Sequence, residues 1–131
     1  MVSSSPEIRY TSLHEIGIFP NEGDPGLQGE IKNVFNVGVP YGCKGDEYLK
    51  LFEENALPFI KQFEPELVIV AAGYDALGGD PLANVNLKPV DYGRITRLIK
   101  DNFGAVVFGL EGGYGLDKLP LALKSTILEY C

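Results

Sequence analysis

The stretch from Leu67 to Leu82 places the strongest constraint on how this chain folds. Its first part, residues 67–72, is apolar at every position, whereas a strand with one solvated face alternates apolar and polar residues. Such a run predicts a central strand of a parallel sheet that is covered on both faces. Gly73 and a Gly-Gly-Asp-Pro turn then end the strand and begin a surface loop that carries Asp75.

Asp75 follows this strand directly, and ligands of open α/β sheets bind beyond the carboxyl ends of the strands. One interpretation is therefore that Asp75 is a metal ligand or a catalytic carboxylate. The other is that its side chain only caps the following turn. The local pattern leaves both interpretations open.

Composition narrows the class of protein. A chain of 131 residues, 45% of them hydrophobic, has enough material for one domain with a core. A net charge of −7 argues against direct nucleic-acid binding through a basic surface. No apolar stretch approaches the ~20 residues of a membrane span, and the first residues lack an apolar signal core. Cys43 and Cys131 stand alone, which favours a reducing intracellular compartment, nucleus or cytoplasm.

Helical and strand patterns alternate along the chain, which predicts an α/β fold with a mostly parallel sheet and flanking helices. Residues 1–7 are expected to be a disordered lead, and residues 8–131 form the domain. Strands are expected at 8–14, 34–39, 67–72 and 105–110. Helices are expected at 47–63 (capped by Asp46 and either kinked or split in two at Pro58), 89–102 and 116–130, the last burying Leu119, Ala122, Leu123 and Ile127. The long segment 15–33 is expected to be a functional or poorly ordered loop.

A second strand end carries Glu111-Gly112-Gly113-Tyr114. Because strands joined by one helical crossover are often neighbours, we expect Tyr114 and Asp75 at the same rim of the sheet. Gly112 and Gly113 let the backbone pass close to a ligand. Taken alone, Gly-Gly-Tyr is a weak motif whose tyrosine more often packs than reacts. His14, the only histidine, is either a ligand or base or, more commonly for such a position, a structural group.

Five separated motifs together resemble the histone deacetylase superfamily, which includes histone deacetylases, acetylpolyamine amidohydrolases and acetoin-utilisation proteins. The resemblance runs from about residue 8 to the C-terminus and is nearer to the class II and bacterial branches. The motifs, in order, are Ser12-Leu13-His14 with Phe19-Pro20, Gly73-Tyr74-Asp75-Ala76, Gly79-Asp80-Pro81-Leu82, Asn86-Leu87, and Leu110-Glu111-Gly112-Gly113-Tyr114.

The resemblance implies the C-terminal half of an arginase/deacetylase-like fold and zinc-dependent removal of acetyl groups from lysine, as in chromatin regulation, or from other amines. It implies that Asp75 is a zinc ligand and that the Tyr114 hydroxyl stabilises the oxyanion. The remaining implied roles concern substrate and a second ion: Phe19 and Leu82 would line the acyl-lysine tunnel beside Gly112 and Gly113, and Ser12 and Leu13 would belong to a potassium-type monovalent-cation site.

The sequence departs from the family pattern at several positions. Leu77 stands where many class II members have histidine, Gly115 follows the tyrosine in place of asparagine, and Asn21-Glu22 replaces Gly-Thr. The paired general-base histidines and the Asp-x-His zinc ligands of the family have no counterpart here. We therefore expect the chain to be inactive alone.

Three hypotheses follow: part of a zinc-dependent deacetylase, a non-catalytic binding module that keeps half of the fold, or an unrelated α/β protein, which five matching motifs disfavour. In the family, the strand with the Asp-x-His ligands lies between the strand pair 8–14/34–39 and the pair 67–72/105–110. Without it, either the two pairs close up or another chain fills the gap. Open apolar edges favour pairing, so a homodimer or a swapped assembly is expected.

Overall fold

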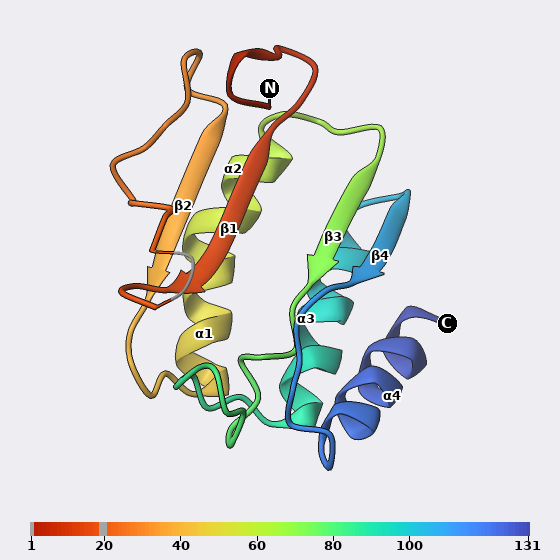
Figure 1. Cartoon of the computed structure of the whole chain (residues 1–131). Helices are drawn as coiled ribbons and strands as arrows, with labels where there is room; N and C mark the ends of the chain where they lie inside the picture. The colour runs from red at the N-terminus through yellow and green to blue at the C-terminus, as the bar shows by residue number, and fades with distance from the viewer. Residues whose placement is uncertain (1, 19–20) are drawn as a thin grey trace.

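The computed structural model describes residues 2–18 and 21–131 (Figure 1). Strands and helices alternate along the chain, which confirms the predicted α/β class. All described strand pairing is parallel: β1 (Tyr10–Glu15) lies beside β2 (Val34–Val39), and β3 (Val68–Ala72) lies beside β4 (Val106–Leu110). Each strand forms within two residues of its expected bounds.

The two strand pairs do not join into one sheet. β1 and β3 face each other across a gap, and within the described part of the chain no ladder of hydrogen bonds connects them (Figure 1). The first expected outcome, in which the pairs close up, is therefore wrong. Helices hold the pairs at this distance, because α1 (Gly45–Leu51) packs on α3 (Pro89–Asn102) behind the strands.

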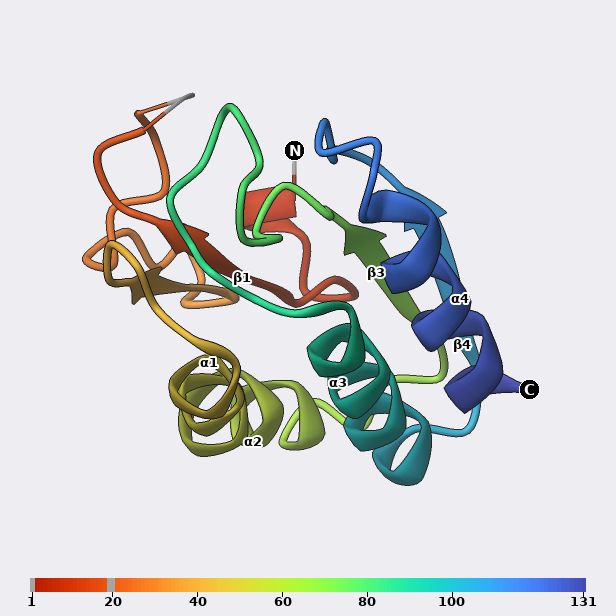
Figure 2. The same cartoon turned by 90° about the horizontal axis from the view of Figure 1, so that it is seen from below.

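The helices lie mainly on one side of the strands. Figure 2 shows α1, α2 and α3 below β1 and β3, with α4 beside α3. α3 has the bounds expected from Pro89, whose missing N–H costs nothing in the first turn. The remaining helical elements are η1 (Val2–Ser4), η2 (Phe52–Ala56), α2 (Leu57–Lys61) and α4 (Leu119–Tyr130).

The segment expected to be a helix that is kinked or split at Pro58 consists of α1, the π-helical η2 and α2. Pro58 has no N–H, and its ring crowds the carbonyl four residues earlier, so the regular ladder gives way to a wider turn just before it. Asp46 is not the cap, as had been expected, because Lys44 occupies that position. Asp46 instead lies in the first turn, where its Oδ1 accepts a hydrogen bond of 2.8 Å from Arg94.

β3 is covered on one face only, so the prediction of a strand buried on both faces is wrong. Ile69 is 73% exposed, and Val107 on the neighbouring β4 is 53% exposed. Their strand neighbours Val68, Val70 and Val106 pack toward α3. An apolar run typical of a central strand thus lies beside the gap with an open face.

The core has two parts, and Leu13 of β1 contacts both of them. One part lies beneath the carboxyl ends of the strands, and the other lies between the strands and the helices nearer their amino ends. The buried members of the first are Val39, Cys43, Tyr74, Leu77, Val85, Leu87, Tyr92 and Ala122. Those of the second are Phe52, Ala56, Leu57, Ile99 and Val106.

α4 begins three residues later than expected, and its buried face differs from the expected one at a single position. Leu119 and Leu123 pack against the first part of the core as expected, but Ile127 does not. Ile127 is 57% exposed, whereas Ala122 and Thr126 are buried. The reason is a polar contact that hydrophobic periodicity does not reveal: the Tyr74 hydroxyl donates to Thr126 Oγ1 at 3.0 Å. No helix in the described ranges is long and apolar enough to span a membrane.

The lead is held more firmly than expected for a disordered segment. Residues 2–4 form the short helix η1, and the side-chain amide of the buried Asn33 lies within hydrogen-bond distance of three carbonyl groups of the lead and the start of the domain. Its Nδ2 lies 2.7, 3.1 and 2.9 Å from the carbonyl oxygens of Val2, Ser5 and Ile8. These bonds satisfy carbonyl groups that a free lead would leave to water.

Candidate active site

The ends of β3 and β4 continue side by side into the two loops of interest. The Glu111 N–H donates to the Ala72 carbonyl at 3.1 Å, and the Tyr74 N–H donates to the Gly112 carbonyl at 2.7 Å. Asp75 and Tyr114 therefore leave neighbouring strands at one rim, as the crossover argument predicts.

Asp75 lies against the glycines of both strand ends. A Cβ atom built on Gly112 would come within 3.0 Å of Asp75 Oδ2, and one built on Gly73 within 2.9 Å of Oδ1. Any larger residue at Gly112 would push the carboxylate or the second loop away. The two glycines thus allow a carboxylate to fit between the strand ends.

Burial raises the pKa of the Asp75 carboxyl group, and repulsion from Asp80 acts in the same direction. Hydrogen bonds from the backbone N–H groups of Asp75 itself and of Ala76 oppose this shift but do not cancel it. The backbone bonds resemble those expected of a turn-capping residue. The surroundings therefore stabilise the negative charge of Asp75 only in part, and a nearby cation would stabilise it further.

Three tyrosines lie beneath this carboxylate. Tyr74 stacks on Tyr92 with ring centroids 4.7 Å apart. Burial raises the pKa of the Tyr48 and Tyr92 hydroxyl groups, and the negative charge of Asp75 raises both further. Both phenols therefore stay neutral. The Tyr92 hydroxyl is buried without a hydrogen-bond partner within the described chain.

Tyr114 presents its side chain at the opening of this rim, where it is 52% exposed. Its backbone is fixed: the Tyr114 N–H donates to Asp80 Oδ2 at 2.7 Å. Gly113 just before it has a φ of +140°, and a Cβ there would lie 2.8 Å from Tyr74 Cβ. The loop thus needs glycine at 113 for its conformation and for its close approach to Tyr74.

The other predicted site residues are spread around the rim. Leu82 is 62% exposed on the loop that follows Asp75. Phe19 lies outside the described residues. Ser12 and Leu13 lie on β1, across the gap from β3, and Leu13 packs into the core.

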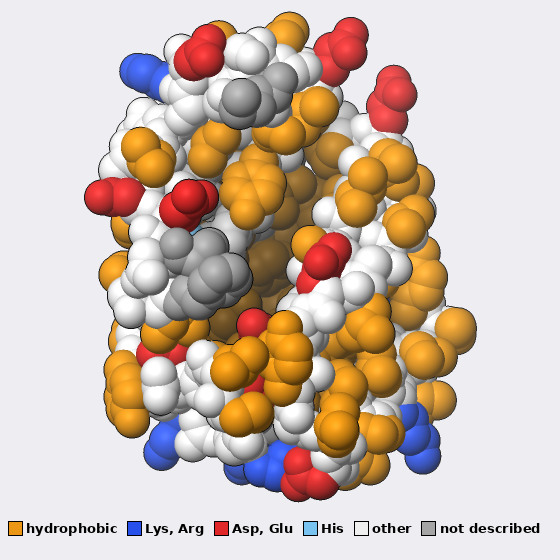
Figure 3. Space-filling model, viewed as in Figure 1, with side chains coloured by type: hydrophobic (Ala, Val, Ile, Leu, Met, Phe, Trp, Pro, Cys, Tyr) orange, Lys and Arg blue, Asp and Glu red, His pale blue; other side chains and the backbone are white. Residues whose placement is uncertain are grey.

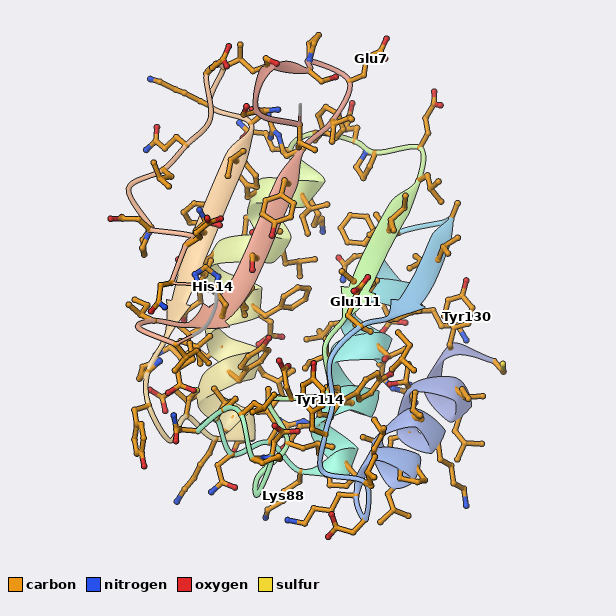
Figure 4. The ribbon with its side chains drawn as sticks, in the orientation of Figure 1. Glu7, His14, Lys88, Glu111, Tyr114 and Tyr130 are labelled. Carbon is orange, nitrogen blue, oxygen red and sulfur yellow. The ribbon has the colours of Figure 1, made fainter. Side chains whose placement is uncertain are left out.

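Both ring nitrogens of His14 are engaged within its own sheet. Nδ1 lies 3.0 Å from Ser12 Oγ, and Nε2 lies 2.9 Å from the Gly23 carbonyl. Because a carbonyl only accepts, Nε2 carries a proton; in the neutral ring, Nδ1 then accepts from the Ser12 hydroxyl. This arrangement fits the structural interpretation of His14, which lies on the β1 side whereas Tyr114 lies below β3 (Figure 4).

A catalytic zinc takes three protein ligands. Within residues 2–18 and 21–131, no three His, Cys, Asp or Glu side chains come together in a way that could hold a metal ion. Cys43 is 1% exposed in the core, and burial raises the pKa of its thiol to about 11. The described donors therefore do not fit a complete zinc centre, although Asp75 fits as one ligand of it.

A groove of about 670 Å³ lies between β1 and β3, and Figure 3 shows this hollow with hydrophobic side chains at its base. β1 and β3 form its walls. Its base consists of Tyr48, Phe52, Ile95, Ile99 and Phe103 from the helices behind. Tyr48 belongs both to this base and to the surroundings of Asp75, so the groove reaches the rim.

The chain matches the model of the histone deacetylase domain over residues 1–130. It belongs to the histone deacetylase family. An uncharacterised protein of Synechocystis sp. is 41% identical over 97% of this chain and 42% of its own length. Histone deacetylase HDA1 of Saccharomyces cerevisiae is 37% identical over 86% of this chain and 17% of its own length.

Among solved structures, that of the histone deacetylase Clr3 superposes with a TM-score of 0.92 and is 28% identical, over 98% of this chain and 23% of that chain. This similarity confirms the predicted deacetylase-like fold. The chain spans less than half the length of these deacetylase-family relatives.

Three of the family departures have clear places in the fold. Leu77 is 1% exposed and belongs to the core beneath the strand ends. Gly115 donates its N–H to Asp80 Oδ2 at 3.1 Å. Asn21 has a φ of +60°, a conformation that asparagine tolerates better than most residues.

Sequence reasoning missed several contacts that organise the deacetylase-like rim. Asp80 was visible only as part of a turn motif, and Tyr48 and Tyr92 only as members of helical patterns. Glu15 accepts two hydrogen bonds of 2.8 Å from Asn84, one from its N–H and one from its side-chain amide. Glu15 thereby connects the end of β1 to the loop that follows Asp75, although the two residues are far apart in sequence.

Proposed function

We propose that this chain supplies one zinc ligand and the oxyanion-stabilising phenol of a zinc-dependent deacetylase that acts on acetylated lysine of histone-type proteins or on acetylated amines. The observation that carries the proposal is the joining of two loops at one rim. Asp75 lies against Gly112 of the second loop, and Tyr114 is fixed by Asp80 of the first. Membership of the histone deacetylase family supports the reaction class.

Amide hydrolysis needs an attacking water, an acceptor for its proton, and stabilisation of the charge that grows on the carbonyl oxygen. A catalytic zinc, when bound, supplies an acidified water. In this proposal the Asp75 carboxylate holds one position at the metal. The Tyr114 hydroxyl donates a hydrogen bond to the carbonyl oxygen as its charge grows. The proton acceptor comes from a part of the domain outside these 131 residues.

The loops also provide a path for the substrate. Leu82 is exposed at the rim and, with Phe19, would contact the methylene groups of an acetylated lysine. Gly112 and Gly113 bring backbone rather than side chain to this position, which leaves room for the acyl group. A potassium ion near Ser12 and Leu13 is a further part of the proposal. A reducing compartment, nucleus or cytoplasm, suits the two free cysteines.

The groove between β1 and β3 favours the partial-enzyme hypothesis over an independent binding module. In a parallel strand, alternate residues direct their backbone groups to opposite sides. Because the Val68 N–H bonds to Ala105 on the β4 side, Ile69 and Ala71 direct theirs into the groove. We propose that an extended segment of another polypeptide pairs with this edge, and that a second copy does so when the chain is alone.

The oxyanion role of Tyr114 is tested by Tyr114→Phe in a restored domain, in which the chain is joined to the part of the Synechocystis relative that it does not match. We expect zinc content to be unchanged and kcat on an acetyl-lysine peptide to fall about a hundredfold or more, the usual scale for one oxyanion donor. Tyr41→Phe is the matched control, because Tyr41 is 80% exposed in the turn after β2 and has no role in the proposal. Full activity of the Tyr114→Phe domain would contradict the role.

Pairing through the open edge predicts that the isolated chain self-associates as its concentration rises. Sedimentation velocity over a hundredfold concentration range should show a dimer. Ile69→Lys should weaken it, because a charge beside an open strand edge opposes pairing. Val90→Lys adds the same charge at an exposed position of α3 and should have no effect. A strictly monomeric chain at high concentration would refute the pairing.

A further inference from the structure

Asp80 is the carboxylate that joins the two loops of the rim. It is 7% exposed, and both of its oxygens accept hydrogen bonds from backbone N–H groups. Oδ1 lies 2.9 Å from the Leu82 nitrogen in its own loop. Oδ2 lies 2.7 Å from the Tyr114 nitrogen and 3.1 Å from the Gly115 nitrogen in the other loop.

The hydrogen bonds that Asp80 accepts are stronger than the backbone hydrogen bonds of an ordinary turn. Bonds from N–H groups to a charged carboxylate are shorter and stronger than those between neutral groups, and burial reduces their competition with water. Gly79, with a φ of +93°, turns the chain so that Asp80 points toward the second loop. The Lys118 ammonium group adds a second link between the loops by donating to the Gly78 carbonyl.

The position of Tyr114 depends on these bonds. Gly112 and Gly113 precede it, and Gly115 follows it, so the backbone around Tyr114 has little steric restriction of its own. The half-exposed Tyr114 ring adds little packing to hold it in place. The carbonyl groups of Tyr114 and Gly115 accept bonds from the N–H groups of residues 116, 118 and 119 within the same segment. The bonds that Asp80 accepts from the Tyr114 and Gly115 N–H groups add a restraint from the first loop and so help to position this side chain.

We propose that Asp80 is a positioning residue, which sets the distance between Tyr114 and Asp75 by binding the backbone of the Tyr114 loop. This inference rests on the proposed function only for its effect on catalysis. Its structural part, the restraint of the loop, stands independently and is measured without turnover.

The structural part is tested by amide hydrogen exchange, followed by NMR, in the 131-residue chain. We expect the Tyr114 and Gly115 amides to be protected although they lie outside strands and helices. In Asp80→Asn, one oxygen is replaced by an NH₂ group that cannot accept, so protection of these amides should fall at least tenfold while the β3–β4 amides keep theirs. Asp24→Asn is the control, because the exposed Asp24 accepts a similar turn bond from Gly26 at 2.6 Å.

If Asp80→Asn unfolds and all of its amides lose their protection from exchange, the unaltered chain still tests whether the Tyr114 loop is restrained. Exchange of its Tyr114 and Gly115 amides at the intrinsic rate of an unstructured peptide of the same sequence would overturn the proposal, and protection would support it. The measurement therefore does not depend on whether Asp80→Asn folds.

The catalytic part is tested by a double-mutant cycle in the restored domain. Asp80→Asn should lower kcat about tenfold or more, as expected for a displaced reacting group, with zinc content unchanged. In a Tyr114→Phe background, Asp80→Asn should lower kcat almost no further, because the hydroxyl group that Asp80 positions is already absent. Equal losses in both backgrounds would show that Asp80 does not act through Tyr114. Failure of the proposed function would instead appear as an inactive restored domain with the exchange result intact.

Discussion

Replacing Asp75 by alanine in the restored domain is expected to abolish both zinc binding and deacetylation. Structural and catalytic zinc sites are built from three or four protein ligands, and removing one of three leaves an ion that water competes for effectively. In this protein the carboxylate is also partly desolvated and lies near Asp80, so the two negative charges together attract a cation. The expected readouts are zinc content after dialysis and turnover of an acetyl-lysine peptide.

The matched control is Asp101→Ala, which removes an exposed carboxylate from the last turn of α3. That variant should keep both zinc and activity. A restored Asp75→Ala domain that retains one equivalent of zinc and measurable turnover would show that Asp75 only caps its turn. Comparing this result with that of Tyr114→Phe separates the two roles, because loss of the phenol should leave the zinc in place.

Local chemistry explains why much of the fold was predictable. Val34–Val39 is bounded by Pro40, and Pro89 starts a helix with the expected bounds, because proline acts on the backbone wherever it occurs. The apolar run of β3 predicted a strand correctly but predicted its burial wrongly. Apolar residues indicate what a strand is able to pack against, whereas exposure of Ile69 depends on which segments are present to cover it.

The candidate site likewise contains residues that the sequence predicted and residues that it did not. Strand ends and glycine-rich turns leave a signature in sequence and made Asp75 and Tyr114 candidates, whereas only the family resemblance implied their roles. The contacts of Asp80 were not predicted, because its hydrogen bonds cross from position 80 to positions 114 and 115 and no local pattern encodes them. The tyrosine layer beneath Asp75 was missed for the same reason, since Tyr48 and Tyr92 come from separate helices and meet only when α1 packs on α3.

The isolated 131-residue chain is expected to bind zinc weakly or not at all and to deacetylate nothing. Of the donors proposed for the site, only Asp75 belongs to this chain, and one carboxylate does not hold zinc against water with useful affinity. His14 cannot readily replace a missing ligand, because its two ring nitrogens are engaged by Ser12 and Gly23. Cys43 is buried in the core and, among the described residues, belongs to no group of three metal-ligating side chains.

Calorimetric titration of the metal-free chain with zinc, beside an acetate-release assay on an acetyl-lysine peptide, tests this expectation. Adding the missing segment of the Synechocystis relative as a separate polypeptide provides the positive arm, because it offers a strand for the groove together with further ligands. Zinc binding and turnover should then appear together and should disappear with Asp75→Ala. Submicromolar one-to-one binding by the chain alone, lost in Asp75→Ala, would instead mean that these residues form a complete metal site, and the proposed dependence on a second segment would be wrong.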